Sequence, residues 1–253
     1  MKPLYPKLIK QACMKTFLDR MAELKNREIS DRAVEIPIEA LRDQALVMKP
    51  PSPFREPLAR KETESPRIIA EVKARAPGRE NVAHLDAESV ARDYDAGGAA
   101  AISVLTDESW FGGSLDTLRE VSQSVSLPLM HKEFIISEYQ VLEGRTRGAS
   151  ASLILAYYFS SKQIGEMIDI CRGYGVSFTQ FTYRGADTVR GVVRCGWHFV
   201  YFSAARLGVG KNDIRKRTSD IDPDELHALS PWLYCLTSLN EVRRAWKICV
   251  LWV

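Results

Sequence analysis

Short apolar runs alternate with amphipathic stretches along the chain from residue 67 onward. The runs are rich in Ile, Val, Leu and Ala, as in strands buried on both faces of a sheet, and they predict eight strands at residues 67–73, 99–105, 128–133, 151–155, 176–181, 198–203, 232–236 and 248–253. Apolar positions at helical spacing predict seven helices between them, at residues 87–95, 114–124, 137–147, 161–173, 186–195, 222–228 and 238–247. Strict alternation of this kind predicts a parallel α/β sheet, and eight units fit a closed (βα)8 TIM barrel better than an open sheet.

The first 66 residues precede this repeat and have a different pattern. Residues 3–26 and 36–47 are spaced as helices, and five of the chain's 12 prolines fall within residues 50–66, which indicates an extended connector. We therefore divide the chain into an N-terminal helical extension with a proline-rich connector, 1–66, and a barrel, 67–253. The last predicted strand ends at Val253, so we expect the eighth barrel helix to be absent, with the N-terminal helices or a second copy in a homo-oligomer covering that flank.

Composition narrows the class of protein. Of 253 residues, 45% are hydrophobic and 26% are charged, which is typical of a globular protein in water. The net charge of +3 is too small to predict nucleic-acid binding. No apolar run approaches the roughly 20 residues of a membrane helix, and the N-terminus lacks the apolar region of a secretory signal, so we expect a cytoplasmic protein with no membrane partner. The five cysteines form no CxxC pair and the four histidines no HxxxH pair, which predicts reduced thiols and no metal site.

Charged residues at two predicted strand ends are candidates for chemistry, because functional side chains of α/β barrels lie at the carboxyl ends of the strands. Glu71 and Lys73 are two residues apart and so share the inward face of the first strand, and Lys132 lies near the end of the third. Two lysines beside one carboxylate could hold an acidic substrate and donate a proton. The alternative is a structural cluster in which Lys73 pairs with Glu71 and Lys132 with Glu133.

Three stretches of the chain resemble the indole-3-glycerol phosphate synthase family. Residues 68–73 (IIAEVK) are similar to the family's first barrel strand, IAEVKRASPSKG, and residues 105–114 (LTDESWFGGS) are similar to its LTxxxyFgGS. Residues 128–136 (PLMHKEFII) are similar to its PvLrKDFI, and residues 137–140 (SEYQ) follow in place of D-x-Y-Q. The three stretches occur in the family's order and at comparable spacing. The resemblance is specific over residues 5–180 and weak beyond them.

The resemblance implies a (βα)8 barrel with an extra N-terminal helical segment. The family's reaction closes an indole ring from a carboxyphenylamino deoxyribulose phosphate, with loss of carbon dioxide and water and without a metal or organic cofactor. Lys132 matches the general acid that protonates the substrate carbonyl, and Lys73 matches the lysine that contacts the substrate carboxylate and assists proton transfer. Glu71 matches the acid that orients both lysines. Phe111 matches an aromatic wall of the substrate pocket, and Arg75 either attracts an anionic group of the substrate or is a solvated surface residue.

The last third of the chain departs from the family at three strand ends. The fifth predicted strand carries Gln180 where the family has a general-base Glu, and a glutamine can hydrogen-bond but cannot take a proton at neutral pH. The sixth ends in Ser203 where the family has INNRDL, and the seventh lacks the family's Glu. No glycine follows Gly210, so a glycine-lined phosphate cradle after the last strands is not expected. We assign Gln180 and Ser203 to substrate binding.

These observations leave three functions open. The first is a lyase resembling indole-3-glycerol phosphate synthase that closes a ring, with loss of carbon dioxide or water, on a modified acidic arylamine substrate of specialised metabolism. The second is the family's ordinary reaction in tryptophan biosynthesis, retained with different residues. The third is a non-catalytic barrel that binds a ligand or a partner protein. Turnover of the family's ordinary substrate would separate the second function from the other two.

Overall fold

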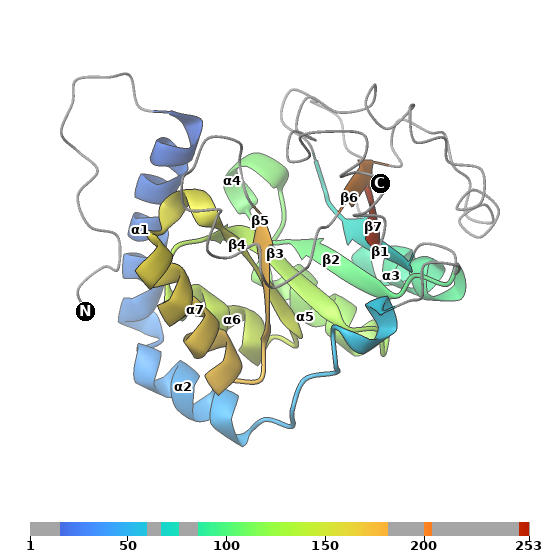
Figure 1. The fold of residues 1–253 in the computed structure, drawn as a ribbon, viewed down its shortest axis with the longest axis horizontal. Helices are drawn as coiled ribbons and strands as arrows, with labels where there is room; N and C mark the ends of the chain where they lie inside the picture. Colours follow the sequence, from blue (N-terminus) through green and yellow to red (C-terminus); the bar gives the residue numbers. More distant parts are fainter. Residues whose placement is uncertain (1–15, 60–66, 76–85, 182–199, 204–247, 253) are drawn as a thin grey trace.

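The computed structural model describes residues 16–59, 67–75, 86–181, 200–203 and 248–252 (Figure 1). Its strands form one parallel seven-stranded sheet with the order β5-β4-β3-β2-β1-β7-β6. The strands are β1 (Arg67–Val72), β2 (Ala101–Leu105), β3 (Leu129–Ile135), β4 (Ala151–Leu155), β5 (Ser177–Phe181), β6 (Val200–Ser203) and β7 (Ile248–Trp252). The predicted strand at 232–236 lies outside the described residues, as do the predicted helices at 186–195, 222–228 and 238–247.

Apart from β6, which pairs with the predicted eighth strand and not with β5, the described strands follow the ring order of an α/β barrel. The first five strands neighbour one another in chain order, and β7, the predicted eighth strand, pairs in parallel with β1. This pairing between the first and last strands of the chain is the contact that closes a (βα)8 barrel. The predicted sixth strand, β6, follows β7 in the sheet. The architecture is therefore the predicted TIM-type barrel.

Helices cover the outer face of the sheet. They are α3 (Ala87–Ala96), α5 (Leu115–Ser124), α6 (Glu138–Thr146) and α7 (Ser161–Gly173), each within a few residues of its predicted range. The side chains between the sheet and α3 and α5 form one apolar cluster that includes Ile68, Val104 and Leu118. Because β1 and β2 are covered on both faces, almost every one of their residues is buried, which explains their continuous apolar sequence.

The N-terminal helices pack against α6 and α7. Helix α1 (Phe17–Glu35) begins at a capping box formed by Thr16 and Asp19, and α2 is Ile38–Val47. The prediction of a helix ending at residue 26 was wrong at that end, because α1 continues to Glu35 and stops before Pro37, whose ring disfavours a helical residue at Ile36. Figure 1 shows α1 and α2 beside α6 and α7. Among the described residues, no helix has both the length and the apolar character needed to cross a membrane.

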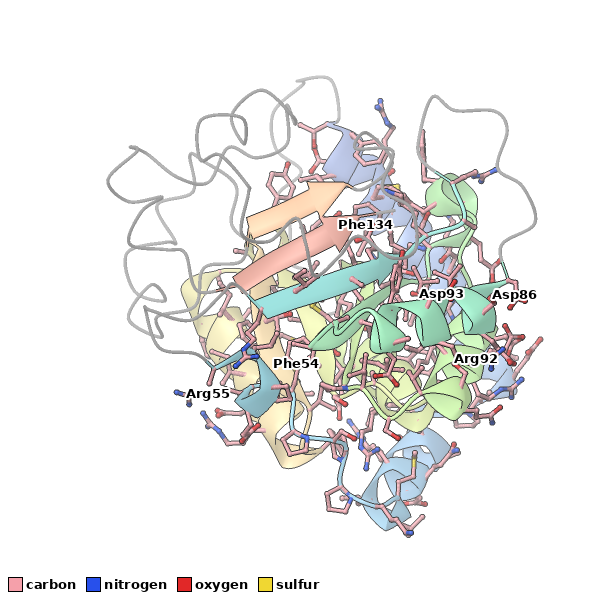
Figure 2. All side chains as sticks on the ribbon, turned by 90° about the vertical axis from the view of Figure 1, so that its right-hand side faces the viewer. Phe54, Arg55, Asp86, Arg92, Asp93 and Phe134 are labelled. Carbon is pink, nitrogen blue, oxygen red and sulfur yellow. The ribbon has the colours of Figure 1, made fainter. Side chains whose placement is uncertain are left out.

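The proline-rich connector closes the amino-terminal end of the sheet. Phe54 and Leu58, the latter in the short helix η1 (Glu56–Leu58), are buried with Ile69, Ala101 and Met130 near the starts of β1, β2 and β3. In Figure 2, Phe54 lies at the beginning of the strands and Phe134 lies near their carboxyl ends. Since apolar residues fill the amino-terminal end, the opposite end is left for polar groups.

Candidate active site

Three charged side chains meet at the carboxyl ends of β1 and β3. The Glu71 carboxylate accepts a hydrogen bond from Lys132 Nζ at 2.5 Å through Oε2 and forms an ion pair with Lys73 Nζ at 3.5 Å through Oε1. Strand β2 lies between β1 and β3, so Glu71 and Lys132 can touch only because both project from the same face of the sheet. The structure thus brings together the two lysines and the glutamate that the sequence singled out.

Burial sets the electrostatics of this trio. The Glu71 side chain is 0% exposed, whereas the side chains of Lys73 and Lys132 are 9% and 13% exposed. Loss of solvation lowers the pKa of Lys132 to about 8, although the Glu71 carboxylate opposes the shift. An ammonium group with such a pKa is largely protonated at neutral pH and can still release its proton, which suits a general acid.

Glu133 is not part of this trio. It follows Lys132 on β3, and its Oε1 forms an ion pair with Lys25 Nζ at 3.2 Å. Adjacent residues of a strand point to opposite faces, so β3 presents Lys132 on one face and Glu133 on the other. The alternative pairing of Lys132 with Glu133 is therefore replaced by Lys132 with Glu71 and Glu133 with Lys25.

A short helix, α4 (Glu108–Phe111), follows β2. Asp107 caps it by accepting from the backbone N–H groups of Trp110 at 2.7 Å and Phe111 at 3.1 Å. Gly112 ends it with φ +64°, a left-handed conformation that favours glycine. A Cβ on Gly113 would lie 2.0 Å from the carbonyl oxygen of Leu105, so only glycine fits there.

Phe111 lies among aromatic rings from three elements. Its ring centroid is 6.3 Å from that of Phe134, which is 6.1 Å from Phe17 on α1. Phe17 in turn packs against Trp110 in a T-shaped arrangement, with the two ring centroids 5.0 Å apart. The predicted aromatic wall is therefore one ring of a four-ring cluster beside the end of β3, and the N-terminal helix supplies part of it.

Arg75 lies directly after β1 and binds α4. Its guanidinium donates to the carbonyl oxygens of Ser109 at 2.6 Å, Glu108 at 3.1 Å and Trp110 at 3.3 Å, and its backbone N–H donates to Phe111 O at 3.0 Å. These bonds tie the end of β1 to α4. An anion-binding role for Arg75 stays a prediction, and its guanidinium already has protein partners.

Two predicted binding residues are placed only by their backbones. Gln180 lies in β5 and Ser203 ends β6, and their side chains are outside the described part of the structure. Residues 204–247, which include Gly210 and the predicted seventh strand end, lie outside the described residues altogether. Within the described residues, no group of three or more His, Cys, Asp or Glu side chains is arranged so that it could hold a metal ion.

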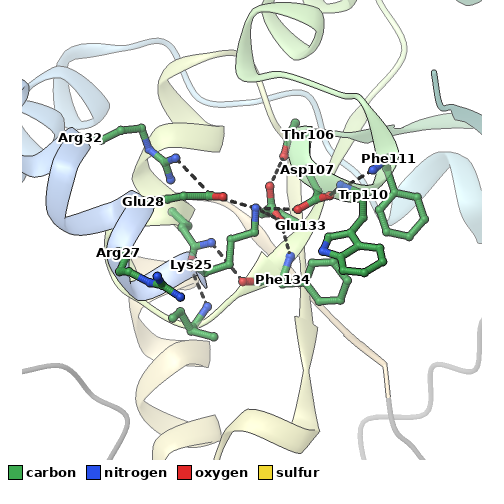
Figure 3. Close-up of polar contacts among 12 residues, drawn as sticks. Lys25, Arg27, Glu28, Arg32, Thr106, Asp107, Trp110, Phe111, Glu133 and Phe134 are labelled. Atoms are coloured by element: carbon green, nitrogen blue, oxygen red, sulfur yellow. Dashed lines mark hydrogen bonds and ion pairs between the residues drawn. The ribbon is translucent and has the colours of Figure 1, made fainter. Parts of the chain in front are cut away.

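Sequence reasoning missed a second charged cluster, on the opposite face of β3 from Lys132. Lys25 of α1 is 1% exposed and lies among the carboxylates of Glu28, Asp107 and Glu133 (Figure 3). A signal was present in the sequence, because Lys25 occupies the helical spacing of the buried positions Met21 and Ile29. A lysine on an apolar helix face needs buried partners.

A family model described as indole-3-glycerol phosphate synthase matches residues 18–178. The chain belongs to the indole-3-glycerol phosphate synthase family. The matched part contains Glu71, Lys73 and Lys132, and it ends before Gln180 and Ser203. The predicted membership of this family is confirmed.

Several relatives carry the same description. The chain is 32% identical over 218 residues to the indole-3-glycerol phosphate synthase of Desulfosudis oleivorans, covering 84% of this chain and 82% of that protein. It is 42% identical over 159 residues to the one from Aquifex aeolicus, covering 62% of this chain and 60% of that protein. For the relatives from Microcystis aeruginosa, Acaryochloris marina and Leifsonia xyli, the match likewise spans less than two thirds of their length, at 57%, 54% and 62%.

Proposed function

We propose that the protein is a carbon–carbon lyase that catalyses the ordinary reaction of its family. It would convert a carboxyphenylamino deoxyribulose phosphate into indole-3-glycerol phosphate, carbon dioxide and water, as a step of tryptophan biosynthesis in the cytoplasm. The observation that carries the proposal is the contact of Lys132 and Lys73 with the two oxygens of the buried Glu71 carboxylate. The relatives described as indole-3-glycerol phosphate synthase support the choice of substrate.

Lys132 is proposed as the general acid. Its ammonium, with a pKa lowered by burial to about 8, would donate a proton to the carbonyl oxygen of the sugar-derived chain. The carbonyl carbon then accepts the electron pair of the aromatic ring carbon that bears the carboxyl group, and a carbon–carbon bond closes the five-membered ring. Loss of carbon dioxide and then of water restores the aromatic system. The chemistry requires no oxidant and no cofactor.

Lys73 and Glu71 are proposed to orient the reacting groups. Lys73 would bind the substrate carboxylate, while Glu71 holds both ammonium groups on one face of the sheet. Phe111, with Phe134 beside it, would contact the flat anthranilate ring. We propose Arg75, Gln180 and Ser203 as further substrate contacts.

A second candidate is a modified acidic aromatic substrate of specialised metabolism. It is favoured by Gln180 at a strand end where the family has a carboxylate, because the amide cannot act as the base in the dehydration step. A substrate that is closed and decarboxylated without that dehydration would not need such a base. The absence of all turnover would instead favour the third reading, a barrel that binds a ligand or partner protein.

The test is direct. The purified full chain is incubated with the carboxyphenylamino deoxyribulose phosphate, and the appearance of indole fluorescence is followed at neutral pH. Turnover, together with growth of a complemented tryptophan auxotroph, supports the proposal. If both fail, non-phosphorylated arylamine acids are screened for release of carbon dioxide, and a positive result would replace the first candidate by the second. Light scattering of the same sample tests the expected homo-oligomer.

A further inference from the structure

We propose that Lys25 is a positioning residue. From α1 it holds Asp107 and Glu133 on the face of the sheet opposite Lys132, and these carboxylates keep Phe111 on α4 and Lys132 on β3 in the positions that the proposed reaction needs. The kinetic part of this inference rests on the proposed function. Its structural part does not, and can be tested without substrate.

The ammonium group of Lys25 meets three carboxylates at short range. Its Nζ lies 2.7 Å from Asp107 Oδ2, 2.9 Å from Glu28 Oε2 and 3.2 Å from Glu133 Oε1 (Figure 3). The contact with Glu28 is a hydrogen bond, and the contacts with Asp107 and Glu133 are ion pairs. Glu28 is on α1 itself, whereas Asp107 follows β2 and Glu133 lies near the end of β3. Lys25 therefore joins the N-terminal helix to both.

Asp107 transmits this contact to α4. The two carboxylate oxygens of Asp107 have different partners. Oδ2 forms the ion pair with Lys25, and Oδ1 accepts hydrogen bonds from the backbone N–H groups of Trp110 and Phe111. A helix of four residues is far too short to be stable by itself, so its place depends on the cap and on Arg75. Without Lys25, the Asp107 carboxylate would be buried at 0% exposure beside the negative Glu133. It would have to move toward water, which would loosen the bonds that hold Phe111.

Glu133 transmits the contact to β3. Its Oε1 also accepts from Phe134 N at 2.7 Å, and its Oε2 accepts from the hydroxyl of Thr106 at 3.0 Å. The backbone N–H of Thr106 donates to the carbonyl oxygen of Lys132 at 3.2 Å. The Glu133 carboxylate therefore bonds directly to Phe134 and, through Thr106, is linked to the backbone of Lys132, the residue proposed as the acid. Lys132 projects from the opposite face, so Lys25 acts on it only through the backbone.

His131, which lies beside this network, is neutral around pH 7. The Thr106 hydroxyl donates to Glu133, so it accepts from His131 Nε2, 2.9 Å away, which must then carry the hydrogen. Burial lowers the pKa of His131 to about 3, and the positive charges of Arg147, Arg32 and Lys25 act in the same direction. His131 therefore stays neutral around pH 7 and adds no positive charge beside Lys25.

The chain offers a matched control for a general loss of helix docking. Arg42 of α2 also joins the N-terminal segment to the barrel, with bonds of 3.0 Å and 2.7 Å to Glu138 on α6. Its carboxylate partner contacts neither α4 nor β3 in any described bond. Replacing Arg42 weakens attachment of the extension and leaves the support behind the site intact.

The experiment compares Lys25→Met and Arg42→Met in the full chain. Amide hydrogen exchange is measured by mass spectrometry for peptides covering 107–114, with peptides from β2 and β4 as internal references. Lys25→Met should speed exchange in 107–114 by about tenfold or more, since the capped amides of Trp110 and Phe111 lose their fixed acceptor. Arg42→Met should leave this peptide unchanged. Lys25→Met should also lower kcat by about 10²-fold, with a smaller change in KM, as expected when a reacting group is misplaced by about 1 Å.

A second variant covers failure of Lys25→Met to fold. Asp107→Asn keeps an oxygen that can cap α4 but removes the charge that Lys25 holds, and it should also speed exchange in 107–114. Unchanged exchange in both folded variants overturns the proposal, as does an equal effect of Arg42→Met. If the wild-type chain does not turn over substrate but the exchange pattern is as expected, the proposed function fails and the positioning role stands. Normal exchange together with wild-type turnover refutes the positioning role alone.

Discussion

Replacing Lys132 by glutamine should abolish most of the proposed ring closure while leaving the fold intact. The glutamine amide can still donate a hydrogen bond to the Glu71 carboxylate, which Lys132 now contacts at 2.5 Å, but it has no proton to transfer. General acid catalysis contributes about 10²–10⁴-fold to a rate, which corresponds to about 2.7–5.4 kcal/mol of transition-state stabilisation. We therefore expect kcat to fall by this factor. KM should change less, because Lys73 remains to bind the substrate carboxylate.

The role of Lys132 also predicts how far kcat/KM of the wild-type protein falls as pH rises. Burial lowers the pKa of Lys132 to about 8, so the fraction that carries the transferable proton decreases as pH rises through that value. About nine tenths of the molecules would be protonated at pH 7 and about one tenth at pH 9, so kcat/KM should fall about tenfold between them. An unperturbed lysine would keep its proton to about pH 10.

The assay is the initial rate of indole fluorescence from pH 6 to 10, with circular dichroism to verify the fold. Lys162→Gln is the matched control, since Lys162 is 88% exposed on α7 and should give a rate within about twofold of wild type. A folded Lys132→Gln protein whose kcat is within about fivefold of wild type would refute the role of this lysine as the acid. Loss of the wild-type activity only above pH 10 would contradict the lowered pKa.

Three further predictions concern stability and are read from thermal or urea unfolding. Gly113→Ala should lower the free energy of unfolding by about 1–3 kcal/mol, because its Cβ would lie 2.0 Å from the backbone oxygen of Leu105; an unchanged melting temperature would contradict this. Leu118→Ala, at 0% exposure between α5 and the sheet, should cost about 2–5 kcal/mol, and a loss below 1 kcal/mol would show that the site collapses without a cavity. Arg145→Met should lower the free energy of unfolding by about 1–3 kcal/mol, because Arg145 donates to the carbonyl oxygen of Lys49 at 2.6 Å. An unchanged urea midpoint would count against this reasoning.

The periodicity of the sequence was sufficient for the barrel elements that the structure describes. Continuous apolar runs gave β1 to β5, and helical spacing gave α3, α5, α6 and α7. Local signals also set the ends of α1, since Thr16 and Asp19 form a capping box and Pro37 follows the helix. The predicted end at residue 26 was too early, because Ile29 and Ala33 continue the buried face of α1, and the helix ends only before Pro37.

Which charges pair was not readable from sequence neighbours. Lys132 is adjacent to Glu133 in the chain, yet it pairs with Glu71, which is 61 residues away. The reason is the pleat of β3, which turns adjacent side chains to opposite faces, together with the parallel order that brings β1 within reach of β3. Alternation placed Lys132 on the inner face, and the family resemblance implied Glu71 as its partner, but only the assembled sheet decided between Glu71 and Glu133.

The sequence by itself determined the barrel, the family and the strand ends that carry Glu71, Lys73 and Lys132, because side-chain period and short motifs are local properties. The tertiary structure alone decided that Lys25 supports Asp107 and Glu133 from behind the sheet, and that Arg75 holds α4. Those contacts join residues from helices and strands far apart in the chain. A buried charge selects its partner by distance and desolvation, and both exist only after the chain has folded.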